Sequence, residues 1–389
     1  MNVYTALIFC TFISLLSYLI KFKFSKLGNV PTPVVILVLS MVTFGAFGDE
    51  TAKTSFNALG NIIFPFFLVS TLITIDLSDV VKNHIKFCVL FFISIASFFV
   101  ATPLAVLLMG RYSSDAWAII SMTVAGWTGG TGNTAATYEM LASQMDTPEI
   151  SFGVVILAGS IPHYLWMIFL IAAATRVSIN DANDANDAND ANDANDANEV
   201  PAHYRDTAQE PQMTFVNVVM FVCTVSAIIL VTKMAAILVS VESNLFTDKS
   251  VEVLGYTVLS IIFSPFFKRM VKFGTLVSSS ALSLYLCCVG AQIEIFGVFS
   301  SGLWFVSAAM LMLIIHFSIT YLAARLMHYS FGQVIVVSAS AIGGAATAPI
   351  VAGCYDRKLI QVSVSLVALG YALGNFSGLV AAFIGQLVP

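Results

Sequence analysis

Long runs of apolar residues recur along the whole chain, and short polar stretches separate them. A helix needs about 20 apolar residues to cross the hydrocarbon core of a bilayer, whereas a membrane β-strand shows about 10 residues of alternating polarity. The runs here are continuous and of helical length, so the pattern predicts membrane-spanning helices. Twelve runs can be drawn, over residues 3–20, 32–48, 57–76, 87–109, 116–143, 150–175, 214–238, 251–267, 273–293, 301–325, 330–353 and 359–387.

Glycines interrupt two of these runs, 116–143 and 330–353. Dense glycine breaks a helix, and the freed backbone groups are tolerated at membrane depth only where protein or water covers them. The simplest structure for each run is a re-entrant hairpin, which enters the membrane and leaves on the same side. The alternative is a spanning helix that is broken midway. The interrupting glycines are Gly126, Gly129, Gly130 and Gly132 in the first run, and Gly343 and Gly344 in the second.

The composition supports an all-α polytopic membrane protein. Of the 389 residues, 58% are hydrophobic and 10% are charged, against about 25% charged in a soluble domain. So apolar a chain cannot be a soluble enzyme, a nucleic-acid-binding protein or a disordered protein. The sequence contains no HExxH, GxSxG, Walker A or dinucleotide-binding motif, so we expect neither an enzyme nor an organic cofactor.

A polar linker at 176–213 divides the runs six and six, so the predicted domains are residues 1–175, the linker, and 214–389. Residues 180–199 repeat the triplet Asn-Asp-Ala and hold six aspartates. Without them the net charge of −5 becomes +1, so the acidic balance says nothing about partners. The repeat cannot bury a core and is predicted to be a disordered acidic linker. A calcium-binding interpretation is possible, although the spacing matches no EF-hand loop.

Basic residues orient the predicted helices. If both interrupted runs are hairpins, ten runs cross the membrane, five in each half. With the N-terminus outside and the linker in the cytoplasm, 13 basic residues lie inside and three outside, as the positive-inside rule requires. The inside residues are Lys21, Lys23, Lys26, Lys82, Lys86, Arg176, Arg205, Lys268, Arg269, Lys272, Arg325, Arg357 and Lys358, and the outside residues are Lys53, Arg111 and Lys249. The count favours this orientation more strongly than it favours hairpins over broken spans.

The two halves are alike, and five crossings per half make them run in opposite directions. At an offset of 214 residues, the pair Gly129-Gly130 lies over Gly343-Gly344. At an offset of 218, Asp76 lies over Glu294, each at the end of the third run of its half. Inverted repeats with interrupted helices at matching positions are typical of secondary transporters.

The hairpin tips are the best candidates for a binding site. Helix ends exposed at a tip attract ions, and glycines let a solute approach the backbone. The tip side chains carry neutral oxygen and amide groups, which suit a sodium ion near Asn133 and Thr347 or a polar solute. Close helix packing through small residues is the alternative. The candidate residues are Thr128, Gly129, Gly130, Thr131, Gly132, Asn133 and Thr134 in the first half, and Ser340, Gly343, Gly344 and Thr347 in the second.

Three further polar residues in apolar runs are candidates, because polar groups are costly at membrane depth. Glu139 follows Asn133 in the returning arm of the first hairpin. It is either a proton or cation ligand or a solvated residue at the hairpin mouth. His163 and Asn375 occupy corresponding places in the sixth and twelfth runs and could line the site together. No Lys or Arg lies clearly at mid-membrane, so backbone N–H groups would have to hold a carboxylate.

These motifs resemble a known family. The stretches GGTGNTAATYEML at 129–141, SAIGGAATAPIVAG at 340–353 and LGYALGNFSGLVAAFIGQLV at 369–388 resemble the YjcL-like family of uncharacterised bacterial membrane proteins. The chain is also more distantly similar to sodium/glutamate and citrate/sodium symporters, which carry paired GGxG motifs at hairpin tips. Only the first copy fits GGxG here, because Ala346 replaces the last glycine of the second. The resemblance implies a transporter of the elevator type in the bacterial cytoplasmic membrane.

We therefore expect a secondary transporter that moves a small organic anion by sodium- or proton-coupled symport. The hairpins, with the third and last helices of each half, would form a moving domain, and the other helices a scaffold and homodimer interface. Two alternatives stay open. One is a cation/proton antiporter, and the other is a membrane sensor or assembly protein that uses a transporter fold without transport.

Overall fold

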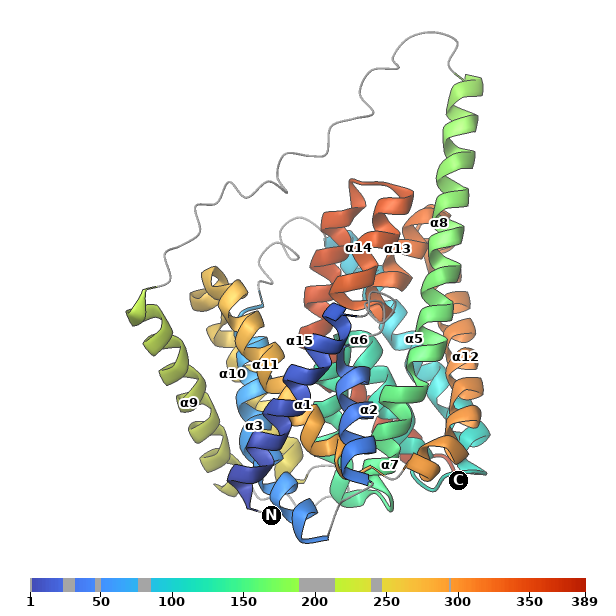
Figure 1. Cartoon of the computed structure of the whole chain (residues 1–389). Coiled ribbons are helices and arrows are strands. Elements are labelled where there is room, and N and C mark those ends of the chain that lie inside the picture. The colour runs from blue at the N-terminus through green and yellow to red at the C-terminus, as the bar shows by residue number, and fades with distance from the viewer. Residues whose placement is uncertain are drawn as a thin grey trace.

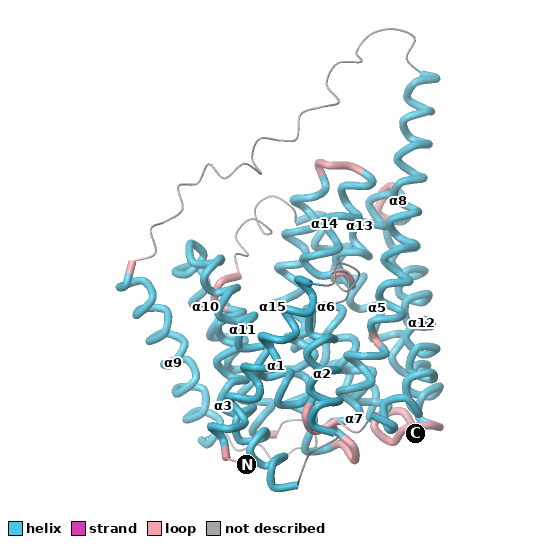
Figure 2. Tube along the Cα trace, in the orientation of Figure 1, coloured by secondary structure: helices cyan, strands magenta, loops and turns pink. Residues whose placement is uncertain are grey.

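The computed structural model describes residues 2–23, 32–45, 50–75, 85–188, 214–238, 247–293 and 295–389. Within these ranges every regular element is a helix, as the sequence predicts, and no strand occurs (Figure 2). The helices are α1 (Val3–Lys23), α2 (Thr32–Gly45), α3 (Glu50–Leu72), α5 (Ile85–Gly110), α6 (Ala116–Leu141), α7 (Pro148–Gly153), α8 (Ser160–Ala188), α9 (Phe215–Leu238), α10 (Asp248–Phe267), α11 (Val271–Gly290), α12 (Ile295–Leu326), α13 (Phe331–Ile342), α14 (Gly344–Tyr355) and α15 (Leu359–Gln386). A π-helical turn, Val154–Ala158, joins α7 to α8.

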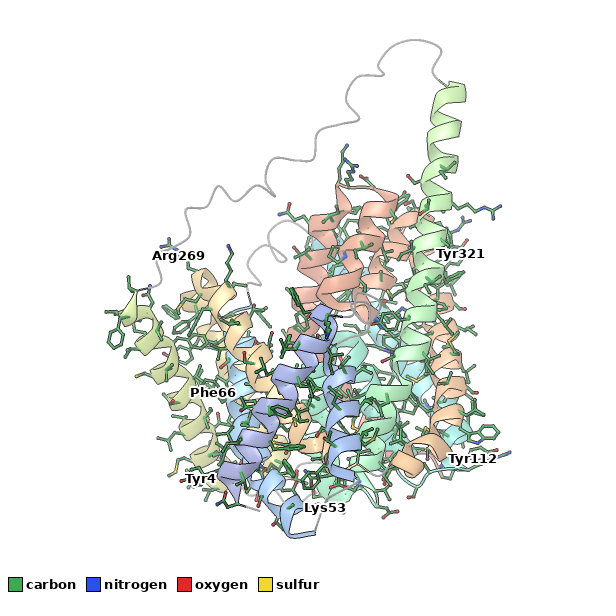
Figure 3. All side chains as sticks on the ribbon, viewed as in Figure 1. Tyr4, Lys53, Phe66, Tyr112, Arg269 and Tyr321 are labelled. Carbon is green, nitrogen blue, oxygen red and sulfur yellow. The ribbon has the colours of Figure 1, made fainter. Side chains whose placement is uncertain are left out.

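Nine helices of the described ranges are long and apolar enough to cross a membrane. Many large apolar side chains are exposed on these helices, as lipid requires, and Figure 3 labels Tyr4 as one of them. Tyr4 is 79% exposed and Leu303 is 72% exposed. The protein is therefore a multi-pass membrane protein.

The tenth predicted crossing, the run 32–48, contains a described helix that is too short to span the membrane. In the run 32–48 the described helix is α2, which has 14 residues. At 1.5 Å per residue it extends about 21 Å, less than the ~30 Å of the hydrocarbon core. Pro33 lies in its first turn, where the missing N–H costs little.

The linker prediction also needs a correction at its first residues. The sequence predicts disorder from residue 176, whereas α8 continues to Ala188. Extending an existing helix by one residue adds one hydrogen bond without a new nucleation cost, so the polar repeat can prolong the apolar helix before it. The rest of the repeat, from residue 189, lies outside the described residues.

The first interrupted run is a hairpin. A straight α6 of 26 residues would separate its ends by about 39 Å, yet the two ends meet. Asp115, just before α6, accepts hydrogen bonds at 2.8 Å from the backbone N–H groups of Asp146 and Thr147, just after it. The helix breaks at Gly130, whose φ of +78° and ψ of 179° are not helical. We call α6 hairpin 1, with a first arm 116–129 and a second arm 131–141.

The second interrupted run is also a hairpin, formed by α13 and α14 and here called hairpin 2. Its arms have 12 residues each, and the break lies at Gly343 and Gly344, where Gly344 has a φ of +62°. The outer ends meet again, since the hydroxyl groups of Ser330 and Tyr355 lie 3.1 Å apart. Both interrupted runs are thus hairpins rather than broken spans.

Helix α15 runs between the two hairpins, which approach it from opposite ends (Figure 1). At its C-terminal end Gln386 donates to the side chain of Gln144, beyond the outer end of hairpin 1. At its N-terminal end Ile360 packs against Gly353 of hairpin 2. The two tips therefore meet near the middle of α15.

The helices pack in two groups, and the third helix of each half packs in the group without the hairpins. Helices α3 and α11, the third of each half, pack on each other and on α1, α2, α9 and α10. Helices α5 and α12 pack on each other, and the hairpins pack with them and with α8 and α15. Small residues on α3 and α11 allow the first arrangement: Gly60 faces Cys288, and Gly290 faces the Leu37 backbone.

Candidate functional site

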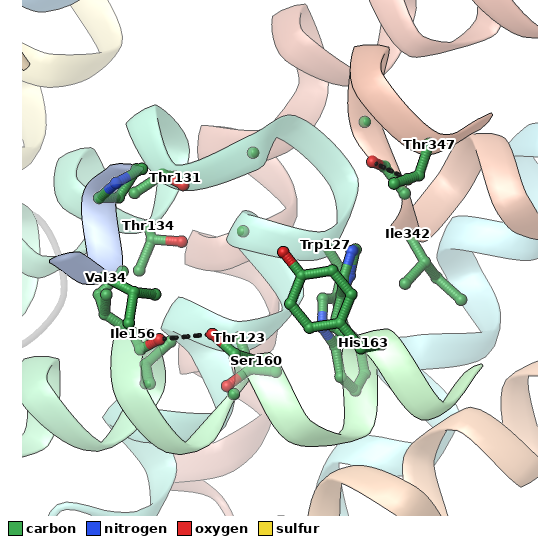
Figure 4. Close-up of a pocket in the computed structure, with 18 of the residues that line it drawn as sticks. Val34, Thr123, Trp127, Thr131, Thr134, Ile156, Ser160, His163, Ile342 and Thr347 are labelled. Atoms are coloured by element: carbon green, nitrogen blue, oxygen red, sulfur yellow. Dashed lines mark hydrogen bonds between the residues drawn. The ribbon is translucent and has the colours of Figure 1, made fainter. Parts of the chain in front are cut away.

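A cavity of about 330 Å³ lies where the two hairpin tips meet (Figure 4). Its walls come from both tips, from the start of α2, from the junction of the π-helical turn with α8, and from Tyr371 of α15. Its size is at the lower end of the range for small-molecule sites. The described lining residues are Pro33, Val34, Thr123, Gly126, Trp127, Gly130, Thr131, Thr134, Val155, Ile156, Gly159, Ser160, His163, Tyr164, Ile342, Gly343, Gly344, Thr347 and Tyr371.

The second arm of each hairpin is a helix whose N-terminus lies at the cavity. The second arm of hairpin 1 starts at Thr131, and α14 starts at Gly344. The first N–H groups of a helix have no partner within it and carry the positive end of the helix dipole. The glycines permit these starts, because positive φ is strained for other residues. Two positive helix ends are therefore directed at one cavity.

Tyr371 joins the two tips. A Cβ atom built on Gly130 would lie 3.0 Å from its ring, and one built on Gly344 would lie 3.8 Å from its hydroxyl. A single phenol side chain thus spans the gap between the tips, and its ring closes one side of the cavity. Any larger residue at Gly130 would push this ring away.

The structure brings half of the predicted site residues to the cavity. They come from both tips and from α8, although the tips are more than 200 residues apart in sequence. Figure 4 shows Thr131 and Thr134 on one side, Thr347 on the other and His163 below them. The predicted residues that line the cavity are Gly130, Thr131, Thr134, His163, Gly343, Gly344 and Thr347.

Four predicted residues of hairpin 1 lie behind the cavity wall. Thr128 and Gly129 pack on the backbone of Gly370 in α15, and Gly132 packs on Phe67 of α3. Asn133 is 3% exposed and turned toward α15.

The other three predicted site residues also lie outside the cavity lining, and each forms a hydrogen bond elsewhere. The Ser340 hydroxyl donates to the Val336 carbonyl within α13. Asn375 donates to the hydroxyl of Thr257 in α10 at 2.8 Å, so it does not face His163 across the cavity. Glu139 accepts a hydrogen bond of 2.8 Å from the Tyr285 hydroxyl in α11.

Asn133 holds the tip of hairpin 1 against α15. Its side-chain Nδ2 donates to the Gly129 carbonyl at 2.6 Å and to the Tyr371 carbonyl at 3.3 Å. Its Oδ1 is buried and has no hydrogen-bond partner among the described residues. The hydroxyl oxygens of Thr128 and Thr137 are also buried without a partner. Such neutral oxygens, with carbonyls freed at a helix break, suit a sodium ion, so the predicted cation near Asn133 stays a prediction that this chemistry fits.

Replacing Asn133 with alanine is expected to weaken solute binding about tenfold and to leave the protein folded. The substitution removes the bond that fixes the Tyr371 backbone beside the tip, and one net hydrogen bond is worth about 1 kcal/mol. Binding is measured by calorimetry on purified protein. Asn57→Ala, at an exposed position of α3, is the control. Unchanged affinity in Asn133→Ala would remove this residue from the site.

Sequence reasoning missed several lining residues, above all Trp127, Tyr164 and Tyr371. The signal for Tyr371 was present, since it is one of two aromatic residues, with Phe376, in the small-residue stretch LGYALGNFSG. The π-helical turn before α8 gave no sequence signal, although such turns often occur at functional sites.

The described lining carries no Asp, Glu, Lys or Arg side chain. One described basic residue, Lys21, lies near the start of α2: its Nζ donates to the Thr32 hydroxyl at 3.0 Å, next to the lining residue Pro33. In the described part of the chain no cluster of three or more His, Cys, Asp or Glu residues could hold a metal ion. Electrostatic recognition in the cavity therefore depends on helix ends and neutral donors.

Comparison with known proteins assigns the chain to a family. The sequence model of the family described as protein of unknown function (DUF819) matches residues 5–388. The chain belongs to the DUF819 family. The match covers both hairpins and every described helix, apart from the first two residues of α1, so the cavity is built entirely from residues of the DUF819 region. The search of curated proteins found no match.

Proposed function

We propose that this DUF819 protein is a secondary active transporter that moves a small organic anion across the bacterial cytoplasmic membrane by sodium- or proton-coupled symport. The observation that carries the proposal is the cavity at which two hairpin tips from opposite ends of the molecule meet. A site reached by oppositely directed hairpins can open to either side of a membrane in turn. The protein binds and releases its solute without chemical conversion.

The packing supports two inverted repeats and an elevator mechanism. Several contacts have a counterpart when the halves are exchanged: α1 with α11 matches α9 with α3, and α2 with α11 matches α10 with α3. The group that contains α5, α12, α15 and the hairpins carries most of the cavity and is the proposed moving domain. The group of α1, α2, α3, α9, α10 and α11 is the proposed scaffold and homodimer interface.

The charge distribution supports an orientation with the outer end of hairpin 2 in the cytoplasm. Arg325 and Arg357 lie at that end, which follows from their places at the end of α12 and the start of α15. Figure 3 shows Arg269 toward the same end and Lys53 at the opposite one. This is the bias that the positive-inside rule requires.

Single cysteines at Ser114 and Arg357, in a background without the six native cysteines, are expected to label from opposite sides of the membrane. Both positions are exposed turns next to the outer ends of the hairpins. Ser114→Cys should react with an impermeant maleimide in intact cells, and Arg357→Cys only after permeabilisation. Labelling of both from one side would contradict opposed hairpins.

The decisive experiment is transport by purified full-length protein in liposomes. A mixture of small organic anions is offered outside, a sodium gradient or a proton gradient is imposed, and the contents are analysed by mass spectrometry. We expect one class of anion to accumulate at least tenfold over liposomes that contain the Gly130→Ala variant. Accumulation under neither gradient would reject coupled symport.

One observation favours antiport as the second candidate. Glu139 is a carboxylate within the membrane region, hydrogen-bonded to the fully buried Tyr285, and could carry a proton. Sodium efflux driven by a proton gradient without any organic solute, and lost in Glu139→Gln, would support antiport and would contradict symport.

A further inference from the structure

The cavity has a side at the tips that carries hydroxyl groups. Thr131 and Thr134 come from hairpin 1 and Thr347 from hairpin 2. Trp127 lies between Thr347 and His163 in Figure 4 and is 6% exposed. Within the described part of the chain its indole N–H donates to no protein acceptor, and its Nε1 is open to the cavity that Trp127 lines. An unused donor in the wall indicates an acceptor that the solute brings.

The charge of that acceptor follows from the helix starts. The second arm of hairpin 1 and the 12-residue α14 both begin at the cavity, and helix N-termini bind anions. Helix α2 also starts there, but Pro33 offers no N–H and the Thr32 hydroxyl already accepts from Lys21. The strongest anion-binding position is therefore at the tips, beside Trp127.

Apart from Thr123, Ser160 and His163, the rest of the lining is apolar or aromatic. Val34, Val155, Ile156 and Ile342 contribute aliphatic surface, and Tyr164 contributes a ring. In this described lining no carboxylate is present to pair with an ammonium group, and no Lys or Arg side chain is present to pair with a second carboxylate. Burying either charge without a partner is costly. Zwitterions and dianions are thus disfavoured.

We propose that the solute is a monocarboxylate with an apolar or aromatic body, held with its carboxylate at the tips beside the Trp127 N–H. The inference rests on the proposed function of the same cavity and adds the chemical class. The carboxylate accepts from the indole and from the first N–H groups of the two helices, and the body packs on the aliphatic residues and rings.

The test compares four probes for binding to purified full-length protein by calorimetry. Phenylacetate is the monocarboxylate, phenylacetamide is its uncharged analogue, succinate is the dicarboxylate and L-phenylalanine is the zwitterion. We expect phenylacetate to bind at least tenfold more tightly than each of the others. Equal or tighter binding of succinate or phenylalanine would overturn the proposal, and so would absence of binding by both phenylacetate and hexanoate.

Two tryptophan variants then locate the carboxylate. Trp127→Phe keeps a ring and removes the N–H, and should weaken phenylacetate about tenfold, as expected for a hydrogen bond to a charged group. It should leave the weak binding of phenylacetamide unchanged. Trp166→Phe is the matched control, because Trp166 is also a buried tryptophan and its Nε1 has no partner, but it does not line the cavity. Equal effects of both variants on phenylacetate would contradict the assignment.

Tight succinate binding that is lost in Lys21→Gln would place a second carboxylate at the start of α2 and would also overturn the monocarboxylate proposal.

The chemical class and the transport function fail in different ways. Accumulation of a dicarboxylate or an amino acid in the liposome experiment would keep transport and overturn the class. Tight phenylacetate binding, weakened by Trp127→Phe but without flux under either gradient, would keep the class and overturn transport.

Discussion

The Gly130→Ala variant is expected to lose at least tenfold in solute affinity and to lose most transport. Gly130 has a φ of +78° with a ψ of 179°, a region that only glycine occupies readily, and forcing another residue there costs about 1–3 kcal/mol. The added methyl would also lie 3.0 Å from the Tyr371 ring. The tip can relieve the strain only by moving the start of the second arm or the ring, and both line the cavity. Affinity is measured by calorimetry and transport in liposomes.

Gly110→Ala is the matched control for this prediction. Gly110 ends α5, and a Cβ built on it meets nothing within 4 Å. We expect its affinity and melting temperature to stay within error of the unmodified protein. If Gly130→Ala also retained full affinity, the observed tip geometry would be irrelevant to binding, and the cavity would lose its support as the site.

The Asp115→Ala variant is expected to lower the melting temperature strongly and to reduce the yield of folded protein. Asp115 is 2% exposed. Its carboxylate accepts from the N–H groups of Asp146 and Thr147 and from the hydroxyls of Thr147 and Ser151, all between 2.8 and 2.9 Å. Hydrogen bonds to a buried charge are worth about 1.5–3 kcal/mol each, so the loss should exceed about 3 kcal/mol in unfolding free energy. These bonds tie the two outer ends of hairpin 1 together.

Asp146→Asn is the control, since the Asp146 side chain is exposed and only its backbone takes part in the network. Its melting temperature should be unchanged. The Asp115→Asn variant keeps the shape and some acceptor capacity and should lie between the two. A melting curve of Asp115→Ala that coincides with that of the unmodified protein would show that hairpin 1 closes without this network.

Local chemistry determined much of the fold from sequence alone. Apolar runs of helical length predict membrane-spanning helices, because no other element satisfies the backbone within lipid. The glycine-dense runs predicted two hairpins, and the breaks lie at Gly130 and at Gly343–Gly344 as expected. Chain reversal at these points is a property of a few consecutive residues, so the sequence carries it.

The direction of each tip side chain was decided by tertiary packing. Thr134 and Asn133 are neighbours in sequence, yet Thr134 lines the cavity and Asn133 is turned toward α15. Successive residues of a helix differ by about 100° in direction, so composition alone cannot say which of the two meets a cavity. The same reason separates His163, which lines the cavity, from Asn375, which contacts α10.

The association of helices from distant parts of the chain was likewise decided only by the tertiary structure. The two hairpins, the start of α2 and Tyr371 come from four separate regions of sequence and share one cavity. The pairing of α3 with α11 and of α5 with α12 depends on which surfaces let two backbones approach closely. Sequence determined that the chain would form membrane helices and reverse at two glycine breaks. The packing of complementary helix surfaces, which no single segment encodes, determined which residues would meet there.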